Sequence, residues 1–388
     1  MKKFFASLNW KYIAFITVFL IICLELFGRV YLSFVLKKSS KPKFQFDSYR
    51  IYSHIPNFKE GDGKKDWILI NGQGFRRSTE VSKVKPAGTF RVFFMGGSAA
   101  HGISSAPPYP LVHIYMNETV DYYLEQKLKA LHPGKKIEVI NAAVTGYQVF
   151  QHTAYLLSEL LNYSPDLVVF MDGANDHYFT NPEFDYMGSN RYQFWKPRLQ
   201  QPSIGGWFTY GWLWLSKYSG FARGVYSWML NNDASSYDKL SIRSGKDFTS
   251  DAELIAAHKK TAQQDFLRAI EANLLILKAN GVESIVSLQP MLVLRNKTNL
   301  SSAEKAFLHT DEAIQKLYPQ VLAYLKTLSN KYQVPFVDLN PAFNTPALSQ
   351  KQLLIDYCHL SPLGGETVAN ALLPSVDSIF VKSKLNLN

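Results

Sequence analysis

A serine, an aspartate and a histidine occupy positions from which they could act together on an acyl group. Ser98 follows the apolar run Val92–Met95 and two glycines, while Asp356 and His359 lie three residues apart near the C-terminus. A serine hydroxyl is a poor nucleophile until a histidine accepts its proton, and a carboxylate usually orients that histidine. The Asp-x-x-His spacing brings both side chains to one side of a turn. We therefore expect Asp356 to orient His359, His359 to face Ser98, and an ester to be cleaved through an acyl-Ser98 intermediate.

Acyl chemistry of this kind also needs hydrogen-bond donors for the negative charge that develops on the carbonyl oxygen. The sequence offers three: the backbone N–H groups of Ser98 and Gly146 and the side-chain amide of Asn175. A glycine allows the backbone to approach a substrate closely. We predict that these three groups form an oxyanion hole, and that the reaction requires no metal and no organic cofactor.

Short apolar runs precede most of these residues and predict the strands that position them. The predicted strands are Phe90–Met95, Ile137–Asn141, Leu167–Met171, Ser284–Leu288 and Pro335–Asp338. Helical patterns fill most of the gaps, over Asn117–Leu131, Gln148–Asn162, Asp251–Asn280 and Ser302–Lys331. Strands that alternate with helices are typical of a parallel sheet covered on both faces. Ligands of such sheets lie outside the carboxyl ends of the strands, which is where the candidate residues stand.

Four segments, "GGS", "NAAVTGY", "GAND" and "DYCHL", resemble the four blocks of the SGNH, or GDSL-type, hydrolases in their usual order. The resemblance covers about residues 67–375 and assigns the four letters to Ser98, Gly146, Asn175 and His359. It implies a flavodoxin-like three-layer α/β/α fold that hydrolyses esters or thioesters or, in some branches, transfers acyl groups. Gly97 replaces the aspartate of the GDSL motif, and similar Gly-Gly-Ser forms occur in relatives. The upstream "INGQGFRRS" also resembles an extension found in some members.

Other functions remain open for the same residues. Acyl transfer to a sugar hydroxyl would use the same side chains as hydrolysis, and a binding or assembly protein could keep the fold without catalysis. A nucleotide site is disfavoured, because Gly96-Gly97 lacks the P-loop ending and the Gly-x-Gly-x-x-Gly spacing. The sequence does not identify the substrate, for which an acylated small molecule, a lipid or an acetylated glycan would suit the chemistry.

The positive charge of the chain is confined to its N-terminal part. Residues 1–91 contain 17 Lys/Arg and 6 Asp/Glu, which equals the whole net charge of +11. The remaining residues balance, so we expect no nucleic-acid partner. Only two cysteines are present, Cys23 and Cys358, which excludes a disulfide framework and a metal cluster of Cys/His type. We expect Cys358 to be inert.

An apolar segment near the N-terminus predicts a membrane anchor. Trp10–Leu36 is long enough to cross a bilayer if Glu25 and Arg29, four residues apart on one helix face, form a pair or lie near the interface. A signal peptide would have a basic start and an apolar middle as well, but no cleavage site of small residues follows. Lysines and arginines flank both ends, so charge does not fix the orientation. From the short N-terminal tail we expect a single-pass protein with its catalytic domain on the outer, extracytoplasmic side.

The predicted organisation has three parts and one long insertion. Residues 1–36 form the tail and anchor, 37–88 a stalk or N-terminal extension, and 89–380 the SGNH hydrolase domain. The insertion at 177–249 contains five of the seven tryptophans and is far longer than a usual loop. Three interpretations remain open for it: a satellite core, a lid that contacts substrate, or a contact with the membrane interface.

Overall fold

The computed structural model of the 388-residue chain describes residues 10–35, 43–61, 65–104, 112–177, 215, 218–222, 225, 252–308 and 312–385. The chain divides into two compact units, which are described separately. The sheet unit contains residues 43–189 and 245–388, and the helix unit contains residues 1–42 and 190–244.

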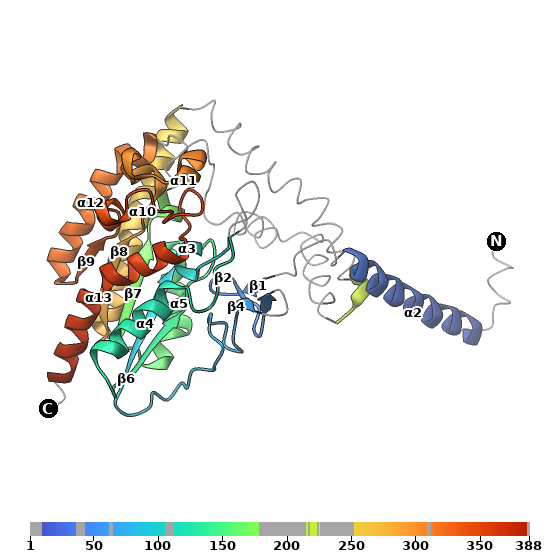
Figure 1. Cartoon of the computed structure of the whole chain (residues 1–388). Helices are drawn as coiled ribbons and strands as arrows, with labels where there is room; N and C mark the ends of the chain where they lie inside the picture. Colours follow the sequence, from blue (N-terminus) through green and yellow to red (C-terminus); the bar gives the residue numbers. More distant parts are fainter. Residues whose placement is uncertain are drawn as a thin grey trace. The chain divides into compact units, whose positions relative to one another are not determined.

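The sheet unit is built on five parallel strands (Figure 1). They are β5 (Thr89–Gly96), β6 (Lys136–Asn141), β7 (Leu167–Asp172), β8 (Glu283–Leu288) and β9 (Phe336–Asp338). Their order across the sheet is β6-β5-β7-β8-β9. Numbered along the chain this is 2-1-3-4-5, the flavodoxin-like order. All five strands were predicted to within one residue at each end, because each has an apolar centre and is bounded by turn residues.

Helices cover both faces of this sheet (Figure 1). One face carries α4 (Val120–Leu131) and α13 (Pro362–Leu385), and the other carries α5 (Val149–Ser158), α10 (Ala252–Ala279) and α12 (Glu312–Tyr332). Alternate residues of β5 point into the two cores: Val92 and Phe94 pack with α4 and α13, whereas Phe93 and Met95 pack with α5. The predicted three-layer α/β/α fold is therefore confirmed.

The helices differ from the predicted ones mainly at their ends. The segment predicted as one helix over Ser302–Lys331 contains two, α11 (Ser302–Phe307) and α12, because Leu308 adopts an extended conformation that ends α11. Helix α13 was not predicted, since its two glycines and Pro374 lower its helix propensity. Gly364 is needed there because a Cβ atom would lie 2.0 Å from the carbonyl oxygen of Leu353.

Residues 43–88 carry two small antiparallel strand pairs. Strand β1 (Phe44–Asp47) pairs with β2 (Ile51–His54), and β3 (Lys59–Gly61) pairs with β4 (Asp66–Leu69). Tyr52, Phe75 and Val81 are buried in the same hydrophobic cluster as Phe93 and Met95 of the central sheet. The segment thus packs as part of the sheet unit.

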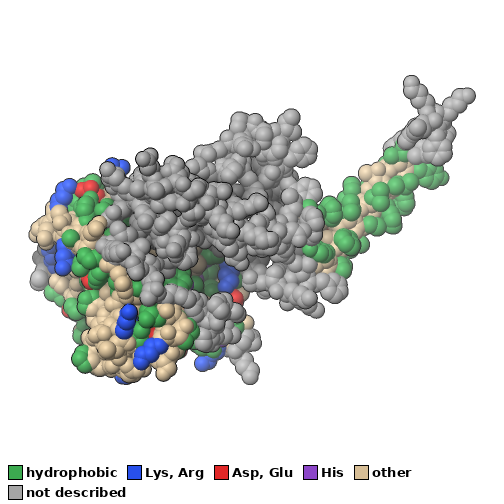
Figure 2. All heavy atoms as spheres, turned by 90° about the horizontal axis from the view of Figure 1, so that it is seen from above, with side chains coloured by type: hydrophobic (Ala, Val, Ile, Leu, Met, Phe, Trp, Pro, Cys, Tyr) green, Lys and Arg blue, Asp and Glu red, His purple; other side chains and the backbone are tan. Residues whose placement is uncertain are grey.

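The helix unit contains α2 (Trp10–Val35), whose 21-residue stretch Lys11–Tyr31 has a mean hydropathy of 2.3 over an 18-residue window. Its surface is almost entirely apolar, as Figure 2 shows. By length and composition it could span a membrane or act as a signal sequence. Of the insertion predicted at 177–249, the structure describes His177, Leu215, residues 218–222 and Val225, so the tryptophans of the insertion lie outside the described residues.

Candidate active site

The candidate residues gather where the strand order reverses. In a 2-1-3-4-5 sheet the crevice lies beyond the carboxyl ends of the first and third strands, here β5 and β7. Strand β5 is followed by Gly97 and the short helix α3 (Ser98–His101), and β7 is followed by Gly173 and α6 (Ala174–His177). Both short helices therefore begin at the same edge of the sheet.

The two glycines before Ser98 are explained by close contacts. A Cβ atom on Gly96 would lie 2.4 Å from the carbonyl oxygen of Met171, and one on Gly97 would lie 2.3 Å from Nδ2 of Asn175. At Gly96 the contact is with backbone, which excludes a side chain, whereas at Gly97 a Cβ atom would displace the Asn175 amide. Gly97 thus brings the backbone beside Ser98 into contact with the Asn175 amide.

Ser98, His359 and Asp356 form one hydrogen-bonded chain. His359 Nε2 lies 2.6 Å from Ser98 Oγ, and His359 Nδ1 lies 2.5 Å from Asp356 Oδ2. The other carboxylate oxygen of Asp356 accepts the backbone N–H groups of Cys358 (2.9 Å) and His359 (2.8 Å). All three side chains are buried, with less than a tenth of each residue exposed. The turn therefore holds the carboxylate from both sides while the far nitrogen of the ring faces the serine.

The surroundings of Asp356 and His359 favour a charged carboxylate beside an imidazole that binds a proton tightly. Burial by itself would raise the pKa of Asp356, but the hydrogen bond from His359 and two backbone N–H groups lower it below its ordinary value. Burial also lowers the pKa of His359, whereas Cys358 and the Asp356 carboxylate raise it, and the balance lies above the ordinary value. The imidazolium that forms when the serine proton is accepted is thus stabilised.

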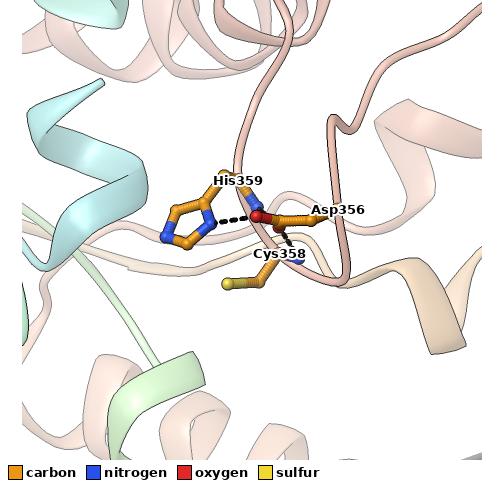
Figure 3. Close-up of side chains that lie close together, drawn as sticks. All are labelled: Asp356, Cys358 and His359. Carbon is orange, nitrogen blue, oxygen red and sulfur yellow. Dashed lines mark hydrogen bonds and ion pairs between the residues drawn. The ribbon is translucent and has the colours of Figure 1, made fainter. Parts of the chain in front are cut away.

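The same turn brings Asp356, Cys358 and His359 close enough to be considered as metal ligands (Figure 3). One ligand atom of each lies within 4.8 Å of the others. However, Asp356 and His359 are already hydrogen-bonded to each other, and a metal ion would break that bond. Burial raises the pKa of the Cys358 thiol, which disfavours the thiolate that binds metals. These side chains fit a hydrogen-bonded pair better than a metal site.

The three predicted oxyanion donors come from three segments at this edge. Asn175 Nδ2 donates one hydrogen to the carbonyl oxygen of Tyr147 at 2.6 Å, which fixes the amide and leaves its second hydrogen for another acceptor. Gly146 has φ +80°, a left-handed conformation that favours glycine. Among the residues that the structure describes, the backbone N–H groups of Ser98 and Gly146 have no acceptor. Donors without partners at such an edge are suited to bind an anionic oxygen.

Contacts between the second and third blocks hold Asn175 in place. Asp176 Oδ1 accepts the backbone N–H of Val149 at 3.2 Å, at the first residue of α5. Gln148 Nε2 lies 3.5 Å from the carbonyl oxygen of Asn175. Burial, together with the neighbouring Asp172, raises the pKa of Asp176 well above its ordinary value. The third block is thus tied to α5 by a carboxyl group whose neutral form is favoured by its surroundings.

A residue that sequence reasoning missed is Arg76, the first arginine of "INGQGFRRS". Its guanidinium is buried and donates to the carbonyl oxygens of His101 and Gly102, at the end of α3, and to that of Ile114 at 3.1 Å. Arg76 therefore fixes the far end of the helix that begins at Ser98. The only signal in the sequence was the resemblance of this segment to a family extension.

Three other described histidines, His101, His113 and His152, make contacts outside this chain of hydrogen bonds. His101 Nδ1 lies 3.1 Å from the carbonyl oxygen of Ala143, and His113 stacks on Trp67 with ring centroids 3.9 Å apart. His152 Nε2 lies 2.9 Å from Asp172 Oδ1. The side chain of His177 lies outside the described residues.

No family model and no curated protein matches this chain. Among solved structures, the chain is similar to a GDSL-like lipase from Parabacteroides merdae, with 12% identity, a TM-score of 0.44, and coverage of 77% of this chain and 100% of the other. It is also similar to an acetylxylan esterase from Geobacillus stearothermophilus, with 15% identity, a TM-score of 0.43, and coverage of 76% and 96%. An acylhydrolase from Bacteroides fragilis gives 13% identity, a TM-score of 0.38, and coverage of 74% and 86%. The likeness is weak, so the assignment of the fold rests on the strand order and the layers.

Proposed function

We propose that this protein is a serine ester hydrolase of the SGNH type that works through an acyl-Ser98 intermediate. The observation that carries the proposal is the continuous hydrogen-bonded chain from Asp356 through His359 to Ser98. It ends at the switch point of the sheet, beside backbone N–H groups that have no acceptor among the described residues. A structural role for any one of these residues would not require all of them at this edge.

In the proposed reaction, Ser98 Oγ attacks the carbonyl carbon of the ester while His359 Nε2 accepts the hydroxyl proton. The carbonyl oxygen becomes negative and accepts hydrogen bonds from the N–H groups of Ser98 and Gly146 and from Asn175 Nδ2. When the tetrahedral intermediate collapses, the bond to the alcohol oxygen breaks and His359 gives its proton to that oxygen. The alcohol leaves, and the acyl group remains bound to Ser98.

The second half of the reaction repeats these steps with water. His359 accepts a proton from the water, whose oxygen attacks the acyl carbon, and the proton returns to Ser98 Oγ as the carboxylic acid leaves. Asp356 does not need to accept a proton at any stage. Its charge and its hydrogen bond to Nδ1 hold the ring in the orientation that serves both halves.

We also propose that α2 anchors the enzyme as a single membrane span, with the sheet unit on the extracytoplasmic side. The support is the length and hydropathy of Lys11–Tyr31 and the apolar surface of α2. Alkaline carbonate extraction of membranes that contain the full chain tests the anchor. The protein should stay with the membrane pellet, and its release into the supernatant would contradict the proposal.

Ester turnover by the full chain in detergent tests the enzymatic proposal. A panel should run from acetyl to long-chain acyl esters and include an acetylated polysaccharide, each substrate measured with wild type and with Ser98→Ala. Wild type should release acid from at least one ester class, and Ser98→Ala from none. Acid release that survives in Ser98→Ala would contradict the acyl-Ser98 mechanism, and silence across the whole panel would contradict hydrolysis.

A further inference from the structure

The carboxylate of Glu25 is a charged group within the apolar part of α2, and its presence there needs an explanation. Glu25 lies within the apolar stretch Lys11–Tyr31, about 9 Å along the helix axis from its end at Tyr31. In a spanning helix, a charged side chain near this depth costs several kcal/mol unless it finds partners. The Glu25 carboxylate and the groups that satisfy it therefore indicate what lies beside α2 in the membrane.

The partners of Glu25 come from the insertion, nearly two hundred residues later in the chain. Oε2 accepts the hydroxyl of Ser219 at 2.7 Å and the backbone N–H of Phe221 at 3.1 Å. Oε1 accepts the backbone N–H of Gly220 at 2.7 Å and Nε of Arg29 at 3.0 Å. Each carboxylate oxygen thus accepts two hydrogen bonds, and Arg29 balances the charge.

The backbones of the two segments also touch at this place. A Cβ atom on Gly28 would lie 2.2 Å from Cα of Phe221, and one on Gly220 would lie 2.6 Å from Cγ of Arg29. Small residues at a contact between helical segments are typical of packing inside membranes, where close backbone approach replaces hydrophobic burial. Gly28 is buried, whereas most of the described surface of α2 is exposed. The short segment beside α2 is visible in Figure 1.

The composition around this contact also suits a lipid environment. Residues 204–230, "IGGWFTYGWLWLSKYSGFARGVYSWML", contain only two charged residues, Lys217 and Arg223, and four tryptophans. Tryptophan and tyrosine are enriched where hydrocarbon meets head groups. Of the three interpretations left open for the insertion, a membrane contact is the one that the partners of Glu25 favour.

We propose that residues 218–222 of the insertion lie in the bilayer against α2, held there by Glu25. The proposal rests on α2 being the membrane anchor. It makes residues 218–222 a second membrane-contacting element of the helix unit. The partner of this surface is therefore the hydrocarbon and head-group region of a lipid bilayer.

Cysteine reactivity of the full chain in proteoliposomes tests the proposal. Cys23→Ser and Cys358→Ala remove the native thiols, and Tyr218→Cys then reports on the insertion while Tyr122→Cys, on α4, is the matched control. Both tyrosines are exposed on the protein, 69% and 39% respectively. N-ethylmaleimide crosses bilayers, so both compartments are sampled. Because the thiolate is the reactive form and lipid disfavours it, Tyr218→Cys should react about tenfold more slowly than Tyr122→Cys. Equal rates would overturn the proposal.

The role of Glu25 is tested in the same background. Glu25→Leu removes all four acceptor contacts and should raise the rate at Tyr218→Cys to that of the control, while Glu25→Gln, which keeps one acceptor oxygen, should give an intermediate rate. If the cysteine of Tyr218→Cys reacted as slowly in Glu25→Leu as before, Glu25 would not be the residue that holds residues 218–222 in the bilayer. Carbonate extraction of the same samples detects a failed anchor, and ester turnover in the vesicles detects a failed enzymatic proposal. Each of these failures therefore differs from a failure of the insertion to enter lipid.

Discussion

Among the described residues of the sheet unit, two buried histidine–carboxylate pairs occur, and they differ in what the second ring nitrogen meets. In both, a ring nitrogen lies within 3 Å of an aspartate oxygen: His359 with Asp356 at 2.5 Å and His152 with Asp172 at 2.9 Å. The second nitrogen of His359 meets Ser98 Oγ at 2.6 Å. The second nitrogen of His152 is buried and has no hydrogen-bond partner among the described residues. A buried histidine with a carboxylate is therefore insufficient to indicate a base, and the hydroxyl beside it makes the difference.

The largest expected effect comes from removing the hydroxyl or the base. Ser98→Ala and His359→Ala should each lower kcat by about 10⁵ or more, because each removes part of one nucleophilic unit. Stopped assays with purified protein measure kcat, and circular dichroism shows that the variants are folded. A double variant should be little worse than either single one. Substantial turnover in either folded variant would show that the His359–Asp356 pair is no more catalytic than the His152–Asp172 pair.

The next largest effect should come from the carboxylate of the first pair. Asp356→Asn should lower kcat by about 10³–10⁴, because the amide can hold the ring in the wrong tautomer and cannot stabilise the imidazolium. The measurement is kcat at the pH optimum of the wild type. Asp172→Asn is the matched variant of the second pair and should leave kcat of the folded enzyme within a few-fold. Similar losses in both variants would show that the two carboxylates play the same role.

Substitutions of Asn175 test the oxyanion donors independently of the base. Asn175→Ala should lower kcat by about 10²–10³ if its second amide hydrogen stabilises the oxyanion. KM should change much less than kcat, since the oxyanion forms only during the reaction. Asn175→Asp keeps the shape but loses the donor, and should be at least as impaired. A wild-type kcat in Asn175→Ala would show that the amide does not stabilise the oxyanion and serves only to form its hydrogen bond to Tyr147.

The dependence of kcat/KM on pH reports the pKa of His359 and so tests whether Asp356 acts on it as a charged partner. His359 must be neutral to accept the serine proton, so activity should rise as pH increases through its pKa. Because Cys358 and Asp356 raise this pKa, the midpoint should lie above the ordinary histidine value of about 6.5. In Asp356→Asn the midpoint should move to lower pH. A midpoint well below pH 6.5 in the wild type would contradict the charged pair.

The smallest effect on catalysis should come from His152. His152→Ala breaks a buried pair and should lower the free energy of unfolding by about 3–5 kcal/mol, because Asp172 is left buried and without its partner. The loss is measured by urea unfolding. Turnover per folded molecule should stay within a few-fold of wild type. A thousandfold loss of kcat with unchanged stability would make the second pair catalytic.

The sheet and the candidate site could be predicted because their signals are local. The strand around Val92–Met95 is buried on both faces and is therefore apolar over these four residues. Glycine follows it at Gly96, where a Cβ atom would meet the backbone of the neighbouring strand. The strand pairs in 43–88 were missed because strands of three or four residues leave little periodicity. The contacts of Arg76 with His101 and Gly102 could not be predicted, since each depends on which distant carbonyl groups the fold brings together.

The separation of Ser98 and His359 along the chain, 261 residues, has a consequence for biosynthesis. Chains emerge from the ribosome N-terminus first, so α2 and the nucleophile are made well before the base. A nascent or prematurely terminated polypeptide can therefore contain α2 and Ser98 while it still lacks Asp356 and His359. Under the proposed mechanism such a product would be inert towards esters, so activity would begin only when no more than the last 29 of the 388 residues remain to be added.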